Sequence, residues 1–148
     1  MIYVELTLNI APADAVNAGA RWKADDGDWQ ASGDYIIGED GGHTMEFTYL
    51  PCWQKPDDID ITLALDSGEI ETLNVSYLEI SSCVPADLNG DSQLDLQDAV
   101  IALQVLAGFD VSDKISSDYP ASGADIDGDG KVGMAEAIYA LEKTAELR

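Results

Sequence analysis

The second half of the sequence carries one pattern twice: an acidic loop followed at once by a stretch with helical character. The first loop is DLNGDSQLDLQD at residues 87–98, and the second is DIDGDGKVGMAE at residues 125–136. In both loops oxygen-bearing side chains occupy the first, third and fifth positions, the eighth residue is apolar and an acid closes the loop. This repeat constrains the region to fold as two similar loop–helix units.

The spacing of these oxygen atoms is that of an EF-hand calcium loop, in which alternate side chains turn inward around one ion. The first loop offers the candidate ligands Asp87, Asn89, Asp91, the main-chain carbonyl of Gln93, Asp95 and Asp98. The second loop offers Asp125, Asp127, Asp129, the main-chain carbonyl of Lys131 and Glu136. The sequence therefore predicts two calcium sites, and the alternative is a pair of solvated acidic turns that cap two helices.

The two loops differ in ways that predict unequal sites. Glu136 is long enough to clamp the ion with both oxygens, whereas Asp98 is one methylene shorter. Ser92 stands where an EF-hand loop has glycine, so we expect it to adopt an unfavourable positive φ at a cost of roughly 1 kcal/mol. We therefore expect the first site to be the weaker. The apolar eighth residues, Leu94 and Val132, are expected to form a short bridge between the loops.

Hydrophobic periodicity divides the chain near Cys83. Before it, short stretches such as IYVELTLNI and HTMEFTYL alternate, and turn signals at Asp25–Asp28 and Asp66–Gly68 predict hairpins. About seven such strands predict an all-β antiparallel sandwich over residues 1–83. Residues 84–148 are expected to form an α-helical module around the paired loops, so the fold class is mixed. The helical stripes are Leu96, Val100, Leu103 and Leu106, and then Met134, Ile138, Leu141 and Ala145.

Both halves resemble known families. The segments DLNGDSQLDLQDAVIALQVLAGF and DIDGDGKVGMAEAIYALEK resemble a type I dockerin, a paired calcium module. That family docks on cohesin domains through the tenth and eleventh loop positions, here Leu96-Gln97 and Met134-Ala135, which lack the family's common Ser–Thr pair. The motifs AGARWKADDGDWQASG, GGHTMEF and CWQKP are similar to PEGA-type and immunoglobulin-like domains of bacterial surface proteins. Together the resemblances imply an exported bacterial protein, extracellular or at the cell surface.

Charge and cysteine content fit such a setting. The net charge of −22 disfavours nucleic acid and anionic lipid as partners and favours multivalent cations. We expect no membrane insertion and, because an alternating strand pattern follows Met1, no signal peptide in this chain. Cys52 and Cys83 are the two cysteines, and outside the cell they predict a disulfide that would close a loop of about 30 residues. The alternative is two unrelated thiols.

We expect no enzymatic activity, because the single histidine, His43, has no recognisable catalytic set. The leading interpretation is a non-catalytic, calcium-binding structural or adhesive module. One alternative is a dockerin that binds a cohesin-like receptor. Another is a subunit of a self-assembling filament, joined through the free edge of the first strand. A third is a carbohydrate-binding module that uses Trp22, Trp29 and Trp53, although strand packing is the favoured explanation of Trp22 and Trp29.

Overall fold

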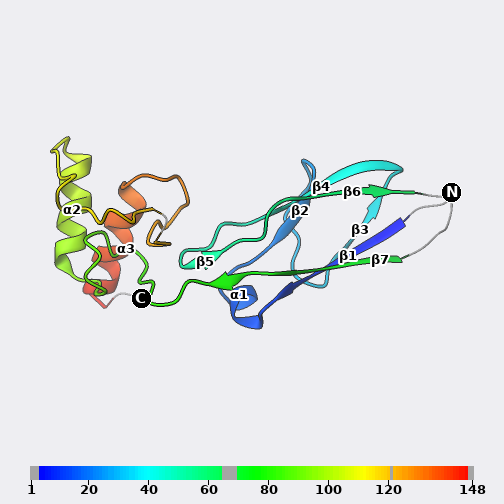
Figure 1. Ribbon diagram of the computed structural model, residues 1–148, viewed down its shortest axis with the longest axis horizontal. Coiled ribbons are helices and arrows are strands. Elements are labelled where there is room, and N and C mark those ends of the chain that lie inside the picture. The colour runs from blue at the N-terminus through cyan, green and yellow to red at the C-terminus, as the bar shows by residue number, and fades with distance from the viewer. Residues whose placement is uncertain (1–3, 65–69, 121, 147–148) are drawn as a thin grey trace. The chain divides into compact units, whose positions relative to one another are not determined.

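The computed structural model describes residues 4–64, 70–120 and 122–146, and it is mixed, with eight short strands in three small sheets and three helices (Figure 1). The chain divides into two compact units. The first comprises residues 1–50 and 55–78, and the second comprises residues 51–54 and 79–148. The sequence-based division was a single boundary after Cys83. Within the described residues, no helix is long and apolar enough to cross a membrane.

The first sheet of the first unit has the order β3-β1-β7, formed by β3 (Tyr35–Gly38), β1 (Val4–Ala11) and β7 (Ile70–Ser76). Strands β1 and β3 are antiparallel, but β1 and β7 are parallel. The expectation of a wholly antiparallel sandwich is therefore wrong for this pair. A parallel pair needs a long crossover, and here the chain between β1 and β7 includes β3 of the same sheet and all three strands of the second sheet. Strand β1 has a neighbour on both sides, so it offers no free edge for self-assembly.

The second sheet has the order β2-β4-β6, formed by β2 (Trp22–Ala24), β4 (Gly41–Phe47) and β6 (Ile59–Leu63). Its strands are antiparallel. Alternate residues of β1 and β4 face the core, as their sequence pattern predicted. The fully or almost fully buried side chains are Val4, Leu6, Leu8, Ile10, Trp22, Met45, Phe47 and Leu63. A Cβ on Gly38 of β3 would collide with Leu63 of β6, so the two sheets pack face to face.

The predicted turns are only partly present. Trp22 and Gln30 form an antiparallel bridge with two main-chain hydrogen bonds of 3.1 and 2.6 Å, and the Asp25–Asp28 turn lies between them. The hairpin predicted at Asp66–Gly68 lies outside the described residues. Its flanking strands, β6 and β7, lie in different sheets, so they do not pair with each other. A short helix that the sequence did not predict, α1 (Ala13–Asn17), follows β1.

The second unit contains the helices α2 (Leu96–Leu106) and α3 (Met134–Thr144) and the strand β5 (Trp53–Gln54). Strand β5 pairs with β8 (Leu78–Glu79), within which the division between the units falls. Two apolar clusters form the core of the second unit. One contains Leu88, Ile101, Ala102, Val111, Ala137 and Val132, and the other contains Ala86, Ala99, Ala140, Leu94, Ile126 and Tyr139. Most of their members correspond across the repeat, namely Leu88 with Ile126, Ile101 with Tyr139, Ala102 with Ala140, Ala99 with Ala137 and Leu94 with Val132. The core of the module is therefore largely duplicated.

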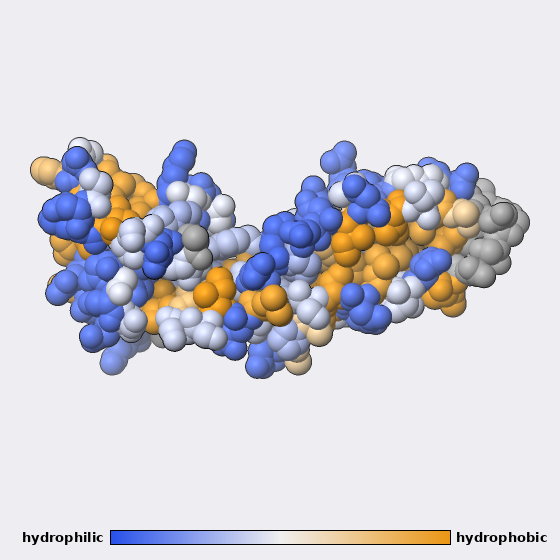
Figure 2. Space-filling view, in the orientation of Figure 1, coloured by the Kyte–Doolittle hydropathy of each residue, from blue (hydrophilic) through white to orange (hydrophobic). Residues whose placement is uncertain are grey.

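The apolar stripes predicted for the two helices do not face this core. Leu96, Val100 and Leu103 of α2 are 57, 43 and 45% exposed, and their equivalents on α3 are also exposed. Figure 2 shows the resulting hydrophobic surface in the region of α2. Alanines line the buried side of the helices, because small side chains let the helix axes approach closely. The large residues thereby remain on the outside.

The predicted disulfide is present. Cys52 and Cys83 are bonded, with their Cα atoms 5.5 Å apart, and the described residues contain no free cysteine. The bond joins residues 51–54 to the segment that enters the first acidic loop. The second unit is therefore built from two stretches that lie far apart in the sequence.

Candidate metal centre

Main-chain N–H groups of the second acidic loop donate hydrogen bonds to its first residue, Asp125. The two carboxylate oxygens of Asp125 accept hydrogen bonds from the N–H groups of Gly128 and Gly130, at 2.9 and 2.8 Å. Asp125 is 3% exposed. Both glycines have positive φ, 78° and 75°, which turns their N–H groups inward. The backbone thus fixes the orientation of this carboxylate before any ligand arrives.

The last residue of the loop, Glu136, lies in the first turn of α3 and is 1% exposed. Its two oxygens accept the N–H groups of Ile126 and Gly133 at 3.0 and 2.8 Å. Glu136 therefore joins the start of the loop to the start of the helix. This is the position from which a closing carboxylate can face an ion held by the loop.

Three side chains of this loop form a cluster that could hold a metal ion. One ligand oxygen each from Asp125, Asp127 and Glu136 lies within 4.8 Å of the other two. All three are hard oxygen donors, which suit calcium or magnesium better than a transition metal. Without a cation, three carboxylates this close repel one another. The donor set therefore fits the predicted cation. Among the described residues, this is the group of three acidic side chains placed closely enough to hold a metal ion.

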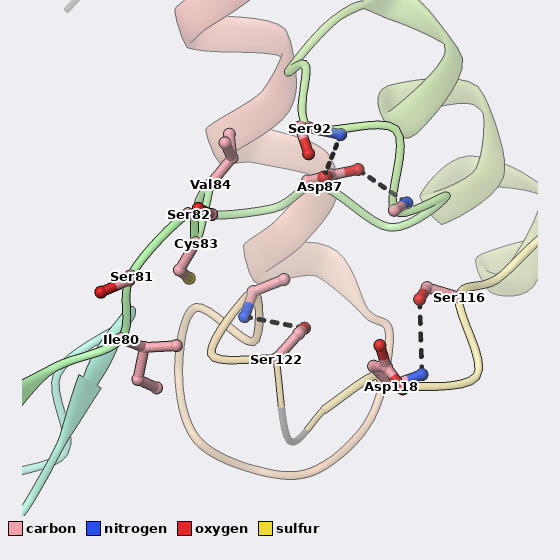
Figure 3. Close-up of a pocket in the computed structure, with 12 residues that line it drawn as sticks. Ile80, Ser81, Ser82, Cys83, Val84, Asp87, Ser92, Ser116, Asp118 and Ser122 are labelled. Atoms are coloured by element: carbon pink, nitrogen blue, oxygen red, sulfur yellow. Dashed lines mark hydrogen bonds between the residues drawn. The ribbon is translucent and has the colours of Figure 1, made fainter.

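The first loop repeats the same hydrogen-bond network. Asp87 accepts the N–H groups of Gly90 and Ser92 at 2.8 and 2.9 Å, as Asp125 does with its glycines (Figure 3). Asp98 accepts the N–H groups of Leu88 and Asp95 at 2.8 and 3.0 Å, as Glu136 does. The two loops thus have equivalent backbones, although an amide, Asn89, takes the third position of the first loop.

Asp98 is the more unusual of the closing acids, because it is completely buried. Burial raises the pKa of Asp98 above its usual range, and the nearby charge of Asp87 raises it further, although three main-chain N–H donors act in the opposite direction. A raised pKa means that the charged form of this buried carboxylate lacks a compensating positive charge nearby. A cation in the first loop would supply it.

The remaining predicted ligands have additional or different contacts. Asp95 caps α2, since its Oδ1 accepts the Gln97 N–H at 2.7 Å. The third and fifth positions each accept the main-chain N–H two residues ahead: these pairs are Asn89 with Asp91, Asp91 with Gln93, Asp127 with Asp129, and Asp129 with Lys131.

Tyr119, which lies beside the second loop, was not predicted from the sequence. Its hydroxyl donates a 2.7 Å hydrogen bond to the Lys131 carbonyl, which is the predicted main-chain ligand. Burial raises the pKa of Tyr119, and the carboxylates of the loop, led by Glu136, raise it further. Tyr119 thus remains a neutral donor that holds this carbonyl in place. A lone tyrosine outside the repeat has no motif from which this role could have been read.

The predicted bridge between Leu94 and Val132 is wrong. The isolated bridge found among the described residues joins Trp22 to Gln30. Leu94 packs in the cluster that contains Ala140 of α3, and Val132 packs in the cluster that contains Ile101 of α2. The cluster of Leu94 also contains Ala99 of α2, and the cluster of Val132 also contains Ala137 of α3, so both loops pack on a core that the two helices share.

Ser92 has the predicted left-handed backbone, with φ of 67°. Its equivalent in the second loop is Gly130, whose φ is 75°. Replacing Ser92 by Gly should remove a strain of about 1 kcal/mol and tighten calcium binding by roughly fivefold. The matched change is Gly130→Ala, where a Cβ meets no atom within 4 Å, so the backbone strain acts alone. Calorimetry should show opposite shifts in affinity for these variants, and shifts of the same sign would contradict this account.

The first unit carries a separate titratable pair. His43 Nδ1 lies 2.8 Å from Asp25 Oδ2, and its Nε2 lies 2.9 Å from the carbonyl oxygen of Glu39. Both contacts raise the pKa of His43, the Asp25 hydrogen bond most. The pKa of Asp25 is lowered, mainly by the Thr44 N–H and then by His43. Both ring nitrogens of the histidine are therefore engaged in holding β4 to the preceding turns.

This pair predicts a pH dependence of stability. Because the native pKa of His43 is raised, its stabilising contribution is fully present below the ordinary value of about 6.5 and is lost as the pH rises through the native pKa. Proton NMR should follow the titration without overlap, because the chain has a single histidine. Asp25→Asn should move the midpoint back toward the ordinary value. An unchanged midpoint in that variant would show that Asp25 is not the cause.

Comparison with known proteins does not identify a family for this chain. No protein-family model, curated protein or solved structure matches the chain. The functional assignment therefore depends on the loop geometry.

Proposed function

We propose that this chain is a non-catalytic calcium-binding module with a structural or adhesive role in an exported bacterial surface protein. The observation that carries the proposal is the duplicated loop, in which equivalent main-chain donors hold equivalent carboxylates. In the second loop Asp125, Asp127 and Glu136 bring three carboxylate oxygens within 4.8 Å of one another. The Cys52–Cys83 disulfide supports an oxidising, extracellular setting.

Calcium is the favoured ion, and we propose two sites. Its six to eight oxygen ligands at flexible distances suit a loop that mixes carboxylates, an amide and carbonyls, whereas magnesium demands octahedral geometry and keeps its waters. The second unit buries mainly small side chains, such as Ala99, Ala102, Ala137 and Ala140, around its helices. Each contributes little hydrophobic stabilisation, so ion binding is expected to supply a large share of the folding free energy.

Calorimetric titration of the full chain tests this proposal. Calcium should bind with a stoichiometry of two per chain and unequal affinities, while magnesium at the same concentration should bind much more weakly. A chelator should reverse the binding and reduce the helical circular dichroism signal. The absence of heat, together with a melting temperature that calcium does not change, would refute the calcium assignment.

A docking role is the second candidate function, and one observation favours it. The exposed apolar residues recur at equivalent positions of the two helices: Leu96 with Met134, Val100 with Ile138 and Leu103 with Leu141. Their exposed fractions match closely, at 57 and 58%, 43 and 47%, and 45 and 40%. Exposed apolar faces of this kind are typical of protein-binding surfaces. A cohesin-like receptor is the partner that the dockerin resemblance implies.

If the helices form a docking surface, substitutions on it should abolish partner binding without changing the fold. Leu103→Glu combined with Leu141→Glu should abolish capture of a cohesin-type domain by the immobilised chain while calcium affinity stays unchanged. The matched control is Tyr35→Glu, which changes an exposed residue, 56% accessible, of the first unit. Equal capture by all three proteins, or none by the wild type, would reject this candidate.

A further inference from the structure

The disulfide lies at the entrance of both acidic loops. Cys83 is on the segment that runs through Val84 into Asp87, the first residue of the first loop (Figure 3). Its partner, Cys52, donates its main-chain N–H to the carbonyl oxygen of Gly123 at 2.9 Å. Gly123 is two residues before Asp125, the first residue of the second loop. The disulfide is therefore connected to the start of the first loop through the chain from Cys83, and to the start of the second loop through the Cys52–Gly123 hydrogen bond.

The two entrances are also joined directly. The Ala86 N–H donates to the carbonyl oxygen of Ala124 at 2.9 Å, and both alanines are buried, at 0 and 2% exposed. These residues immediately precede Asp87 and Asp125. A displacement of either entrance would thus move the first ligand of both loops.

The backbone around the disulfide holds an unfavourable conformation. Cys52, Ser82 and Ala86 have positive φ values of 64°, 62° and 62°, which side chains other than glycine rarely adopt. Residues keep such conformations only where their surroundings impose them. On the Cys52 side, the Ile80 N–H donates to the Cys52 carbonyl at 2.9 Å, so the residue is fixed through its sulfur, its N–H and its carbonyl.

We propose that the Cys52–Cys83 disulfide positions the entrances of both calcium loops, so that calcium affinity depends on the oxidation state of this cysteine pair. The inference rests on the proposed calcium function and adds a regulation to it. In the oxidised protein the disulfide would hold the first residues of both loops in position for the ion. In the reduced protein the strained entrance segment could relax and these residues could move. Because the coupling is reciprocal, bound calcium should make the disulfide harder to reduce by the same factor.

The chemistry needs an external thiol reductant, which we name as a dithiol. One thiolate of the dithiol attacks one cysteine sulfur, the Cys52–Cys83 bond breaks, and the other cysteine leaves as a thiolate. The second thiolate of the dithiol then attacks the dithiol's own sulfur in the mixed disulfide and releases the first cysteine as a thiolate. Two electrons and two protons pass to the cysteine sulfurs, and the dithiol becomes a cyclic disulfide. Both cysteines are only partly buried, so the reductant can reach the bond.

Two titrations of the full chain test the coupling. Calorimetry should show calcium binding to the oxidised protein and binding on the order of tenfold weaker after reduction and alkylation of both thiols, or in the C52S/C83S variant. Equilibration of the unmodified protein with a dithiol buffer should show that saturating calcium shifts the disulfide toward the oxidised form by a comparable factor. The second titration uses the unmodified protein, so it measures the coupling even if the C52S/C83S variant folds poorly.

Two glycine substitutions distinguish an effect on the position of the loop entrance from a general loss of protein stability. A Cβ at Gly123 would lie 3.0 Å from the Cys52 Cα and 2.9 Å from an Ile80 methyl group, whereas one at Gly108 would meet no atom within 4 Å. Their φ values are similar, 82° and 85°. Gly123→Ala should therefore weaken calcium binding to the oxidised protein by about fivefold relative to Gly108→Ala, with the disulfide still formed.

The outcomes are distinct. Weaker binding after reduction, together with protection of the disulfide by calcium, supports the proposal. Equal affinity in the oxidised and reduced states overturns the coupling but leaves the calcium function intact. No binding by the oxidised protein overturns both. Equal effects of the two glycine variants would show that the Cys52–Gly123 contact does not transmit the effect, and would overturn the proposed path into the second loop.

Discussion

Replacing Glu136 by Gln is expected to remove most of the calcium affinity of the second loop. The side chain is 1% exposed and uses both oxygens to accept main-chain hydrogen bonds. In the variant one of those oxygens becomes an NH₂ group, which faces the N–H of Ile126 or Gly133 without an acceptor. An unsatisfied buried donor costs about 1–3 kcal/mol. The proposed site would also lose one of its carboxylates, so we expect affinity to fall by roughly 100-fold or more, or about 3 kcal/mol.

Calorimetry with calcium measures this effect, and Glu146→Gln provides the control. Glu146 is exposed beyond the end of α3, so its replacement makes the same change of charge away from the loops. The control should bind calcium as the wild type does. The first loop should still bind in Glu136→Gln, although more weakly, because Leu94 and Val132 pack against clusters that each contain residues of both α2 and α3. Two unaltered sites in Glu136→Gln would contradict the proposed ligand set.

Replacing Trp22 by Ala is expected to destabilise the sandwich by about 3–5 kcal/mol. Trp22 is fully buried between the sheets, and its indole N–H donates to the Ala31 carbonyl at 3.0 Å. The variant would therefore lose a large apolar contact area and leave a cavity and an unpaired carbonyl. A small domain has a total stability of about 5–15 kcal/mol, so this is a large fraction of it.

Denaturant unfolding monitored by strand circular dichroism measures the loss, and Trp29→Ala is the matched control. Trp29 is 45% exposed, and Lys23 Nζ lies 5.3 Å from its ring centroid. Loss of an exposed cation–π contact costs about 0.5–1 kcal/mol. Similar destabilisation by the two variants would show that Trp22 is not a core residue. The same burial removes Trp22 from any sugar-binding surface.

The sequence predicted which residues of β1 and β4 are buried, because alternation in a strand maps directly onto the two faces of a sheet. It did not predict that β1 and β7 are parallel. Pairing between strands at opposite ends of a unit depends on the path of the intervening chain rather than on local pattern. It also placed the large apolar residues of α2 and α3 on a single face without showing that this face is exposed. A hydrophobic stripe does not reveal whether a core or a partner covers it.

The loops were more predictable than the helices. The repeat fixed the register of Asp87 and Asp125 and the left-handed backbone of Ser92, because the geometry of a tight loop restricts each position. The capping role of Asp95 and the contact of Tyr119 with Lys131 were not foreseen. Asp95 suits both a cap and a water-mediated ligand, and the sequence does not distinguish these roles. Tyr119 lies outside the repeated pattern altogether.

Amide hydrogen exchange along the chain, with excess calcium and with chelator, tests the central claim most directly. The claim is that an ion in each loop orders the second unit. Calcium should slow exchange at least tenfold at the loop N–H groups that bind Asp87, Asp98, Asp125 and Glu136, and along α2 and α3. Exchange in β1 and β4 should not change, which provides an internal control. Equal protection of both loops with and without calcium would contradict the account.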